Sequence, residues 1–246
     1  MDHLGDRMKR HEGAWAQVLP ERTPVVVRVD GKAFHTATRG LQKPVDERIR
    51  GAMRGTAVYL LANMQNAVMA YQQSDEISIL MINYQGQFTQ SWYGNKVQKI
   101  VSVAASLATK AFNDNIYGEG LQSRDWLFDA RAFSLPREEV RNYFVWRQMD
   151  ATRNSISNLG RCHFSQKELN GKPSKEVLEM LKKVGVHWEL MPIQDRMGSV
   201  VIRDSSNEDT YRLIGETPNF VSSKSFFEPF INPPVEVELG QEVAGS

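Results

Sequence analysis

Two short acidic segments hold the residues of this sequence that are best suited to chemistry. Asp30 ends a run rich in valine and is followed by Gly31, and Ser74-Asp75-Glu76 lies between two apolar runs. Mg²⁺ prefers oxygen ligands and usually combines one or two protein carboxylates with substrate phosphates. Two such ions about 3.5–4 Å apart stabilise the attacking and leaving oxygens of a phosphoryl transfer. The segments therefore indicate a metal-dependent phosphoryl-transfer site if they meet, although each alone is also typical of an ordinary turn.

The elements that flank these segments predict that they do meet. Apolar periodicity predicts, in order, a strand over 25–30, a helix over 44–64, strands over 66–72 and 77–82, a helix over 91–113, a strand over 127–133 and a helix over 136–146. This β-α-β-β-α-β order is the split βαβ arrangement, a ferredoxin-like α+β fold whose usual strand order is 4-1-3-2. That strand order places the first strand beside the third and brings Asp30 next to Ser74-Asp75-Glu76.

The first predicted strand has two different faces. Val25, Val27 and Val29 share one face, and Val26, Arg28 and Asp30 share the other. We expect the helices to cover the valine face, which leaves Arg28 and Asp30 on an open face.

The second half of the chain carries a weaker pattern, with a helix predicted over 174–183 and a strand over 199–203. We interpret residues 1–135 as a catalytic core with an N-terminal extension. Residues 136–246 are interpreted as an appended α+β region, including an acidic tail. The two parts are expected to form a single compact unit, because no Pro/Gly-rich linker divides them.

Basic residues near the acidic edge could hold a triphosphate, which needs several donors because Mg²⁺ only partly offsets its charge. The candidates are Arg28, Lys32, His35, Lys43 and Lys96. Lys43 precedes a predicted helix, and a helix N-terminus favours anions. Each lysine taken alone is more typical of a solvated surface position, so the hypothesis depends on their coming together.

The composition narrows the class of protein. The chain has 246 residues, of which 41% are hydrophobic and 24% charged, and this excludes a largely disordered chain. No apolar run approaches the ~18 residues of a membrane span. The polar N-terminus is not a secretory signal. The lone Cys162 excludes an intramolecular disulfide framework and a Cys-rich zinc site, so we expect a cytoplasmic protein.

The charge is unevenly distributed along the chain. The net charge of +1 divides into +6 over residues 1–206 and −5 over residues 207–246, and the last dozen residues are predicted to be poorly packed. A mildly basic body permits nucleic acid binding without requiring it. The sequence has no P-loop, His-Glu-x-x-His or Gly-x-Ser-x-Gly motif, which argues against those enzyme classes.

Several motifs, in the same order along the chain, resemble the tRNA-His guanylyltransferase-like family. They are Val26–His35, Lys43–Asp46, Tyr71–Glu76, Phe128–Arg131 and Trp146–Asp150. The resemblance implies a polymerase-type palm and a 3′–5′ nucleotidyltransferase that extends the 5′ end of tRNA. It also implies two Mg²⁺ ions, ATP and GTP or other nucleoside triphosphates as substrates, and a homotetramer. In the family reaction, ATP adenylylates the RNA 5′-monophosphate, and the 3′-hydroxyl of an incoming nucleotide then displaces AMP.

The resemblance assigns roles to individual residues. Asp30 and Asp75 would hold the metal ions with help from the Gly31 carbonyl, and Glu76 would complete the acidic turn as a catalytic residue. Arg28 and Lys43 would also be catalytic residues, acting in activation. The residues expected to bind nucleotide are Arg28, Lys32, His35, Lys43, Ser74 and Lys96. Candidate contacts to RNA, which would be held chiefly through its phosphates, are Arg131, Arg147, Arg153, Asn154 and Asn158.

One stretch departs from the family pattern. Members that add guanosine to tRNA-His carry His-Ile-Asn-Asn-Leu-Tyr-Asn, whereas residues 152–158 here read Thr-Arg-Asn-Ser-Ile-Ser-Asn. The resemblance to the like-protein branch therefore implies template-dependent repair of 5′-truncated tRNA, with non-templated guanosine addition as the alternative. More remote alternatives are a palm-fold nucleotide cyclase, which lacks support because no Gly-Gly pair precedes Asp75, and a non-catalytic RNA-binding module. The second is disfavoured because residues 77–82 have no aromatic side chain for base stacking.

Overall fold

A six-stranded antiparallel sheet forms the centre of the protein. The computed structural model describes residues 3–121, 124–204 and 210–233, so the predicted poorly packed end from residue 234 onward and much of the acidic tail lie outside it. The strands are β1 (Val25–Gly31), β2 (Ala67–Gln73), β3 (Glu76–Met81), β4 (Phe128–Ser134), β5 (Ser199–Arg203) and β6 (Tyr211–Leu213). Their order in the sheet is β4-β1-β3-β2-β5-β6.

The first four strands lie in the order predicted from the sequence, and β1 pairs with β3 with Val29 opposite Ile77. The strand predicted over 199–203 is β5, with the same bounds, and it extends the sheet by pairing with β2. The short strand β6 was not predicted, because only three residues, Tyr211–Leu213, pair with β5.

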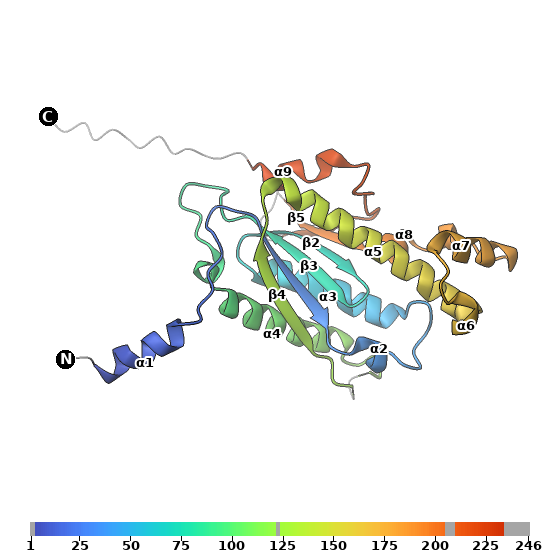
Figure 1. Ribbon diagram of the computed structural model, residues 1–246, viewed down its shortest axis with the longest axis horizontal. Helices are drawn as coiled ribbons and strands as arrows, with labels where there is room; N and C mark the ends of the chain where they lie inside the picture. The colour runs from blue at the N-terminus through green and yellow to red at the C-terminus, as the bar shows by residue number, and fades with distance from the viewer. Residues whose placement is uncertain (1–2, 122–123, 205–209, 234–246) are drawn as a thin grey trace.

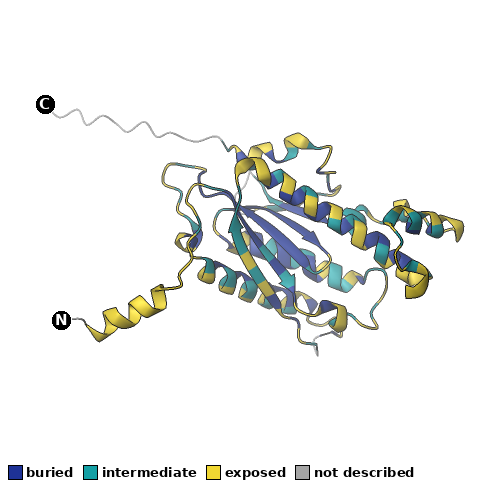
Figure 2. Ribbon diagram, viewed as in Figure 1, coloured by how far each residue is buried: buried dark blue, intermediate teal, exposed yellow. Residues whose placement is uncertain are grey.

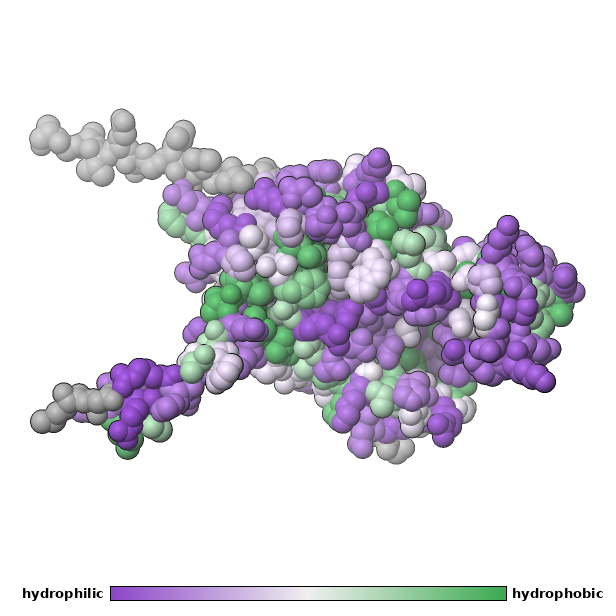
Figure 3. Space-filling model, viewed as in Figure 1, coloured by the Kyte–Doolittle hydropathy of each residue, from purple (hydrophilic) through white to green (hydrophobic). Residues whose placement is uncertain are grey.

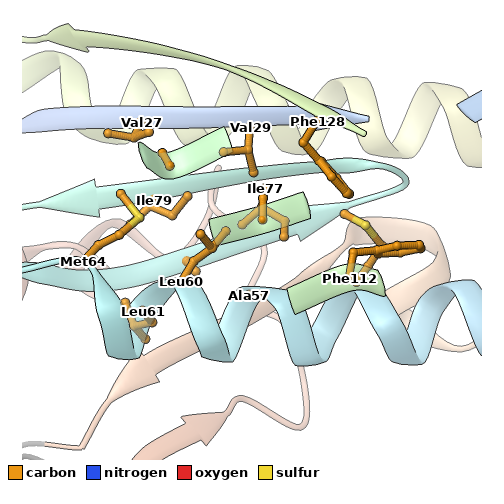
Figure 4. Packing of buried hydrophobic residues seen from close by; sticks show 14 of the residues in the cluster. Val27, Val29, Ala57, Leu60, Leu61, Met64, Ile77, Ile79, Phe112 and Phe128 are labelled. Atoms are coloured by element: carbon orange, nitrogen blue, oxygen red, sulfur yellow. The ribbon is translucent and has the colours of Figure 1, made fainter. Parts of the chain in front are cut away.

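Helices α3 (Glu47–Asn63) and α4 (Val97–Ile116) cover one face of the sheet (Figure 1). Val27 and Val29 point to this face, where they pack with Leu60 of α3 and Phe112 of α4 in a hydrophobic cluster (Figure 4). The valine face of β1 is therefore covered as predicted.

The opposite face, which we predicted to be open, is crossed by helix α5 (Arg137–His163) (Figure 1). Val26 packs there with Leu80 and Phe144. The prediction of an open face was wrong because the helix predicted to end at Trp146 continues to His163. Arg147, Gln148 and Ser155 take buried positions of α5, so its apolar periodicity is interrupted by polar side chains.

Two other helix boundaries also differ from the prediction. Helix α3 begins at Glu47 and not at Pro44, because the Asp46 side chain accepts a hydrogen bond from the Arg48 amide and caps the helix. The helix predicted over 91–113 is divided into a 3-10 turn, η1 (Trp92–Asn95), and α4. Tyr93 and Gly94 have left-handed backbone angles that interrupt it.

Shorter elements surround this core. The C-terminal half of α5 packs with α6 (Gln166–Leu169), α7 (Ser174–Lys183), η2 (Trp188–Leu190) and α8 (Ile193–Met197), and α7 has the predicted bounds. The remaining elements are α1 (Leu4–Gly13), α2 (Phe34–Ala37), η3 (Lys224–Phe226) and α9 (Glu228–Ile231).

Helix α1 and the lobe formed by α6 and α7 project from the core. Helix α1 has no buried residue (Figure 2). Hydrophilic side chains dominate the visible surface of both projections (Figure 3). Within the described ranges, no helix is both long and apolar enough to cross a membrane.

Candidate active site

The two predicted acidic segments meet at one edge of the sheet. Strand β1 ends at Gly31, and the two-residue turn Ser74-Asp75 joins β2 to β3 beside it. Asp30 is the register partner of Glu76, and the Gly31 amide donates a hydrogen bond to the Asp75 carbonyl at 3.0 Å. The backbone therefore brings Asp30 and Asp75 together although they are 45 positions apart in the sequence.

The backbone on both sides of these carboxylates adopts unusual angles. Ser74 has φ of 48° and Ala33 has φ of 56°, both in the left-handed region. A Cβ on Gly31 would overlap the Phe34 ring, which packs in turn against Phe112 and Trp126. Left-handed angles in non-glycine residues cost free energy and cluster at functional sites, where the surrounding structure holds them in place.

Asp30 and Asp75 carry negative charge that no cationic side chain neutralises directly. Burial and the Asp75 carboxylate raise the pKa of Asp30, and burial raises the pKa of Asp75. Neither carboxylate forms an ion pair with any residue in the described ranges. By contrast, a hydrogen bond from Arg48 lowers the pKa of Asp46 to about 2. Two close carboxylates without an ion-pair partner among the described residues, beside the carbonyl of Gly31, fit the oxygen ligands that Mg²⁺ requires.

The metal would need further ligands from outside this pair. No group of three or more His, Cys, Asp or Glu side chains that could hold a metal occurs in the part of the chain that the structure describes. Mg²⁺ is commonly bound by one or two carboxylates together with water and substrate phosphates, so two carboxylates are sufficient.

Asp129 is a nearby acidic residue that was not predicted as part of the site. It lies opposite Asp30 in the β1–β4 register, and its negative charge contributes, after burial, Asp75 and Glu76, to the raised pKa of Asp30. The only signal in the sequence was its position in the segment Phe128–Arg131. The register between β1 and β4 was needed to place it.

Glu76 does not share the unpaired state of Asp30 and Asp75. Its carboxylate forms two 2.8 Å hydrogen bonds with the guanidinium of Arg147 on α5, and both side chains are buried. Arg28, on the same face of β1, places its Nε 3.8 Å from Glu76. The acidic edge therefore has one carboxylate paired with arginine beside two that are not.

Several of the predicted phosphate-binding residues surround the same edge. Lys32 and His35 follow β1 and are exposed, and Ser74 is exposed in the hairpin turn. Lys43 is exposed just before α3, and its charge acts on the Cys162 thiol, about four turns of α5 beyond the Arg147 that bonds Glu76. The described contacts therefore do not place Lys43 beside the carboxylates. These residues are available to an anionic ligand.

Lys96 lies elsewhere. It precedes α4 and bridges to Val18, at the end of the sheet where β1 begins. Gly31, at the other end of β1, pairs with Phe128, whose amide is bonded to Thr109 of α4. Thirteen residues of helix, roughly 20 Å at 1.5 Å per residue, separate Lys96 from that point. Within one chain the structure does not bring Lys96 to the carboxylates.

Comparison with known proteins identifies the family. A family model described as tRNAHis guanylyltransferase matches residues 5–136, more than half of the chain. The chain belongs to the tRNA-His guanylyltransferase family. Members of this family are nucleotidyltransferases that act on tRNA.

Individual relatives extend the similarity beyond the matched region. The tRNA(His) guanylyltransferase of Schizosaccharomyces pombe is 32% identical over 216 residues, which cover 80% of this chain and 79% of the relative. A bacterial Thg1-like protein in complex with ATP has a TM-score of 0.89 at 41% identity, covering 93% of this chain and 99% of that one. A bacterial Thg1-like protein in complex with GTP has a TM-score of 0.80 at 38% identity, with coverages of 94% and 100%.

The predicted RNA contacts of this family member divide into two groups. Arg131, Arg153, Asn154 and Asn158 are exposed. Arg147 is 6% exposed and bonded to Glu76, so its guanidinium does not face solvent where RNA would bind. Sequence reasoning missed this because it could not tell which side of α5 faces the sheet.

Proposed function

We propose that this chain is a template-dependent 3′–5′ nucleotidyltransferase, built on a polymerase-type palm, that adds nucleotides to the 5′ end of truncated tRNA. The observation that carries the proposal is the unpaired Asp30 and Asp75 carboxylates at one sheet edge, in a chain of a nucleotidyltransferase family. Phosphoryl transfer depends on placing and neutralising phosphate oxygens, and this edge offers ligands for a cation beside exposed basic groups.

In this proposal Asp30, Asp75 and the Gly31 carbonyl hold two Mg²⁺ ions. When bound, the metal ions would neutralise charge on the phosphates and stabilise the attacking and leaving oxygens. Lys32 and His35 extend from the same edge, and together with Lys43 they would bind the triphosphate of ATP, GTP or another nucleoside triphosphate. The two solved Thg1-like relatives that bind ATP and GTP support nucleotide binding by this fold.

The reaction would proceed in two transfers. First, an oxygen of the RNA 5′-monophosphate attacks the α-phosphorus of ATP, forming a new P–O bond as pyrophosphate leaves. Second, the 3′-hydroxyl oxygen of the incoming nucleotide attacks the RNA 5′-phosphorus, and AMP leaves. Ser74 and Arg28 would assist by fixing the hairpin turn and the electrostatic field beside the carboxylates.

The exposed surface of α5 supports the template-dependent reaction. Thr152 stands where tRNA-His-specific relatives carry histidine, and it lines a shallow hollow with Met149 and Arg153. Asn154 and Asn158 are exposed one turn apart on the same helix. With Arg131 and Arg153 they would contact the RNA backbone, which would then be held by phosphates and shape while base pairing selects the nucleotide.

Non-templated addition of guanosine to tRNA-His is the second candidate. It is favoured by the relatives named tRNA(His) guanylyltransferase, including the 32% identical protein of Schizosaccharomyces pombe. It uses the same carboxylates and differs only in how the incoming nucleotide is selected.

A cytoplasmic homotetramer completes the proposal. Helix α1 supports an assembled state, because an isolated ten-residue helix with no buried side chain is not stable alone in water. Lys96, remote from the carboxylates of its own chain, would bind nucleotide or RNA phosphates at its own surface.

The test uses a tRNA lacking its first nucleotide and carrying a labelled 5′-monophosphate, with Mg²⁺, ATP and each nucleoside triphosphate in turn. We expect addition of only the nucleotide complementary to the opposing 3′ strand, and the choice should change when the opposing base is changed. Guanosine addition regardless of that base would favour the second candidate. No addition, even to a 5′-triphosphate end, would refute both.

A further inference from the structure

Glu76 is the third acidic residue at the edge, and both oxygens of its carboxylate are hydrogen-bonded by neighbouring side chains. Both oxygens accept 2.8 Å hydrogen bonds from Arg147, whose Nε bonds Oε1 and whose Nη2 bonds Oε2. Ser78 Oγ donates to Oε1 at 3.5 Å, and Arg28 Nε lies 3.8 Å from Oε2. Together with the Ser78 bond, this bidentate pair occupies three of the roughly four lone-pair sites of the carboxylate and leaves little capacity for a metal ion.

Arg147 connects this carboxylate to α5 and not to solvent. Its Nη2 also donates to Asp150 at 2.9 Å, and its guanidinium lies 4.3 Å from the centre of the Trp146 ring. One turn earlier, the Tyr143 hydroxyl is hydrogen-bonded to Ser78 at 2.8 Å. These contacts hold α5 against the N-terminal end of β3, directly after the Ser74-Asp75 turn.

Glu76 also stands where it can set the geometry of both unpaired carboxylates. It directly follows Asp75 and is the register partner of Asp30. The turn before it contains the left-handed Ser74, and its Asp75 carbonyl is bonded to the Gly31 amide. A displacement of Glu76 would therefore move the Asp75 carboxylate relative to Asp30.

We propose that Glu76 is a positioning residue and not a metal ligand. Through its ion pair with Arg147, it fixes the turn that holds Asp75 beside Asp30. The inference rests on the proposed function only in taking Asp30 and Asp75 as the metal-binding pair. The restraint itself belongs to the protein alone, so it exists in the absence of metal, nucleotide and RNA.

Hydrogen exchange at the Gly31 amide measures this restraint without metal or substrate. We expect Glu76→Gln and Arg147→Met each to accelerate this exchange about tenfold or more, because each removes the same buried pair. The double variant should exchange no faster than the single variants, since the second change has no interaction left to remove. As a matched control, Asp114→Asn breaks the exposed Lys110–Asp114 pair on α4 and should leave Gly31 unchanged.

Two results would overturn the proposal in this experiment. One is normal Gly31 exchange in Arg147→Met, and the other is acceleration that adds up in the double variant. Arg147→Lys keeps the charge with one donor group and should restore part of the protection, which separates loss of the pair from general unfolding of α5.

Binding of Mn²⁺, followed by its electron paramagnetic resonance signal, tests the same proposal at the metal. We expect Glu76→Gln and Arg147→Met to weaken Mn²⁺ binding by similar factors without lowering the number of ions bound, whereas Asp75→Asn should lower that number. Loss of a bound ion in Glu76→Gln but not in Arg147→Met would make Glu76 a ligand. The variants could show the expected hydrogen exchange while the wild type extends no tRNA. That result would refute the proposed function and leave the positioning role of Glu76 standing.

Discussion

The two faces of strand β1 are built from opposite kinds of side chain. On one face, Val27 and Val29 pack into the hydrophobic cluster under α3 and α4. On the other, Val26 is apolar, but Arg28 and Asp30 follow it toward the end of the strand. Apolar packing on one face fixes the position of β1. Because β1 is fixed, Asp30 on its other face is held beside Asp75 of the neighbouring turn.

The largest expected effect comes from the polar face. Asp75→Asn keeps the size of the side chain but removes a metal-binding charge, and we expect nucleotide addition to fall by about 10³-fold or more. Labelled-tRNA extension under the conditions described above measures it. A loss smaller than tenfold would contradict the role given to this carboxylate.

The same variant should not lose stability in the absence of metal. The pKa of Asp75 is raised, so the folded state binds more protons than the unfolded state between the ordinary pKa of 3.8 and the raised value, and stability falls as the pH rises through that window. We expect metal-free Asp75→Asn to melt at or above the temperature of the wild type at pH 7. This difference should shrink as the pH is lowered toward 4.

A change on the valine face should lower stability and leave activity almost unchanged. Leu60 on α3 is completely buried in the hydrophobic cluster, and Leu60→Ala should lower the free energy of unfolding by about 3 kcal/mol through lost contacts and a cavity. Denaturant titration measures the loss. Extension of tRNA, assayed well below the melting temperature, should stay within a few-fold of the wild type. A drop comparable to that of Asp75→Asn would mean that the two faces are not separable.

The smallest expected effect comes from the hydrogen bond between Tyr143 of α5 and Ser78 of β3. Tyr143→Phe removes the hydroxyl that bonds Ser78 while keeping the ring packed, and it should cost about 1 kcal/mol of stability. If α5 positions the polar face as inferred, the Mg²⁺ concentration needed for half-maximal extension should rise modestly, with little change in the maximal rate. An unchanged Mg²⁺ requirement would confine this contact to packing.

The sequence was sufficient to predict the parts of the fold that follow from local pattern. A β-branched run located β1, apolar runs located β2 and β3, and the order of elements predicted the strand order that brings Asp30 beside Asp75. The Asp30-Gly31 and Ser74-Asp75 segments could be recognised because turns and chemistry both need particular residues there. The roles of these residues stay predictions until they are tested.

What the sequence could not predict depended on tertiary contacts. Arg147 was predicted to be a surface residue that contacts RNA, because arginine is rarely buried without a partner. Its partner, Glu76, is 71 positions away in the chain, so the pair could not be recognised from the sequence. The length of α5 was underestimated for the same reason. Lys96 was grouped with the other lysines by charge. Its position follows from the packing of α4 on β1, which places the start of α4 near the start of β1 and away from Gly31.

Helix α5 sets the distance between the carboxylates at the sheet edge and the lobe formed by α6 and α7. Arg147 and Leu159 lie on one uninterrupted helix, the first bonded to Glu76 and the second packed among α6 and α7. Twelve residues set their separation at about 18 Å, and each residue turns the helix by about 100°. Inserting a single residue between them would rotate the face of α5 that carries Leu159 by about 100° relative to Arg147, and α6 and α7 would lose their present packing against it.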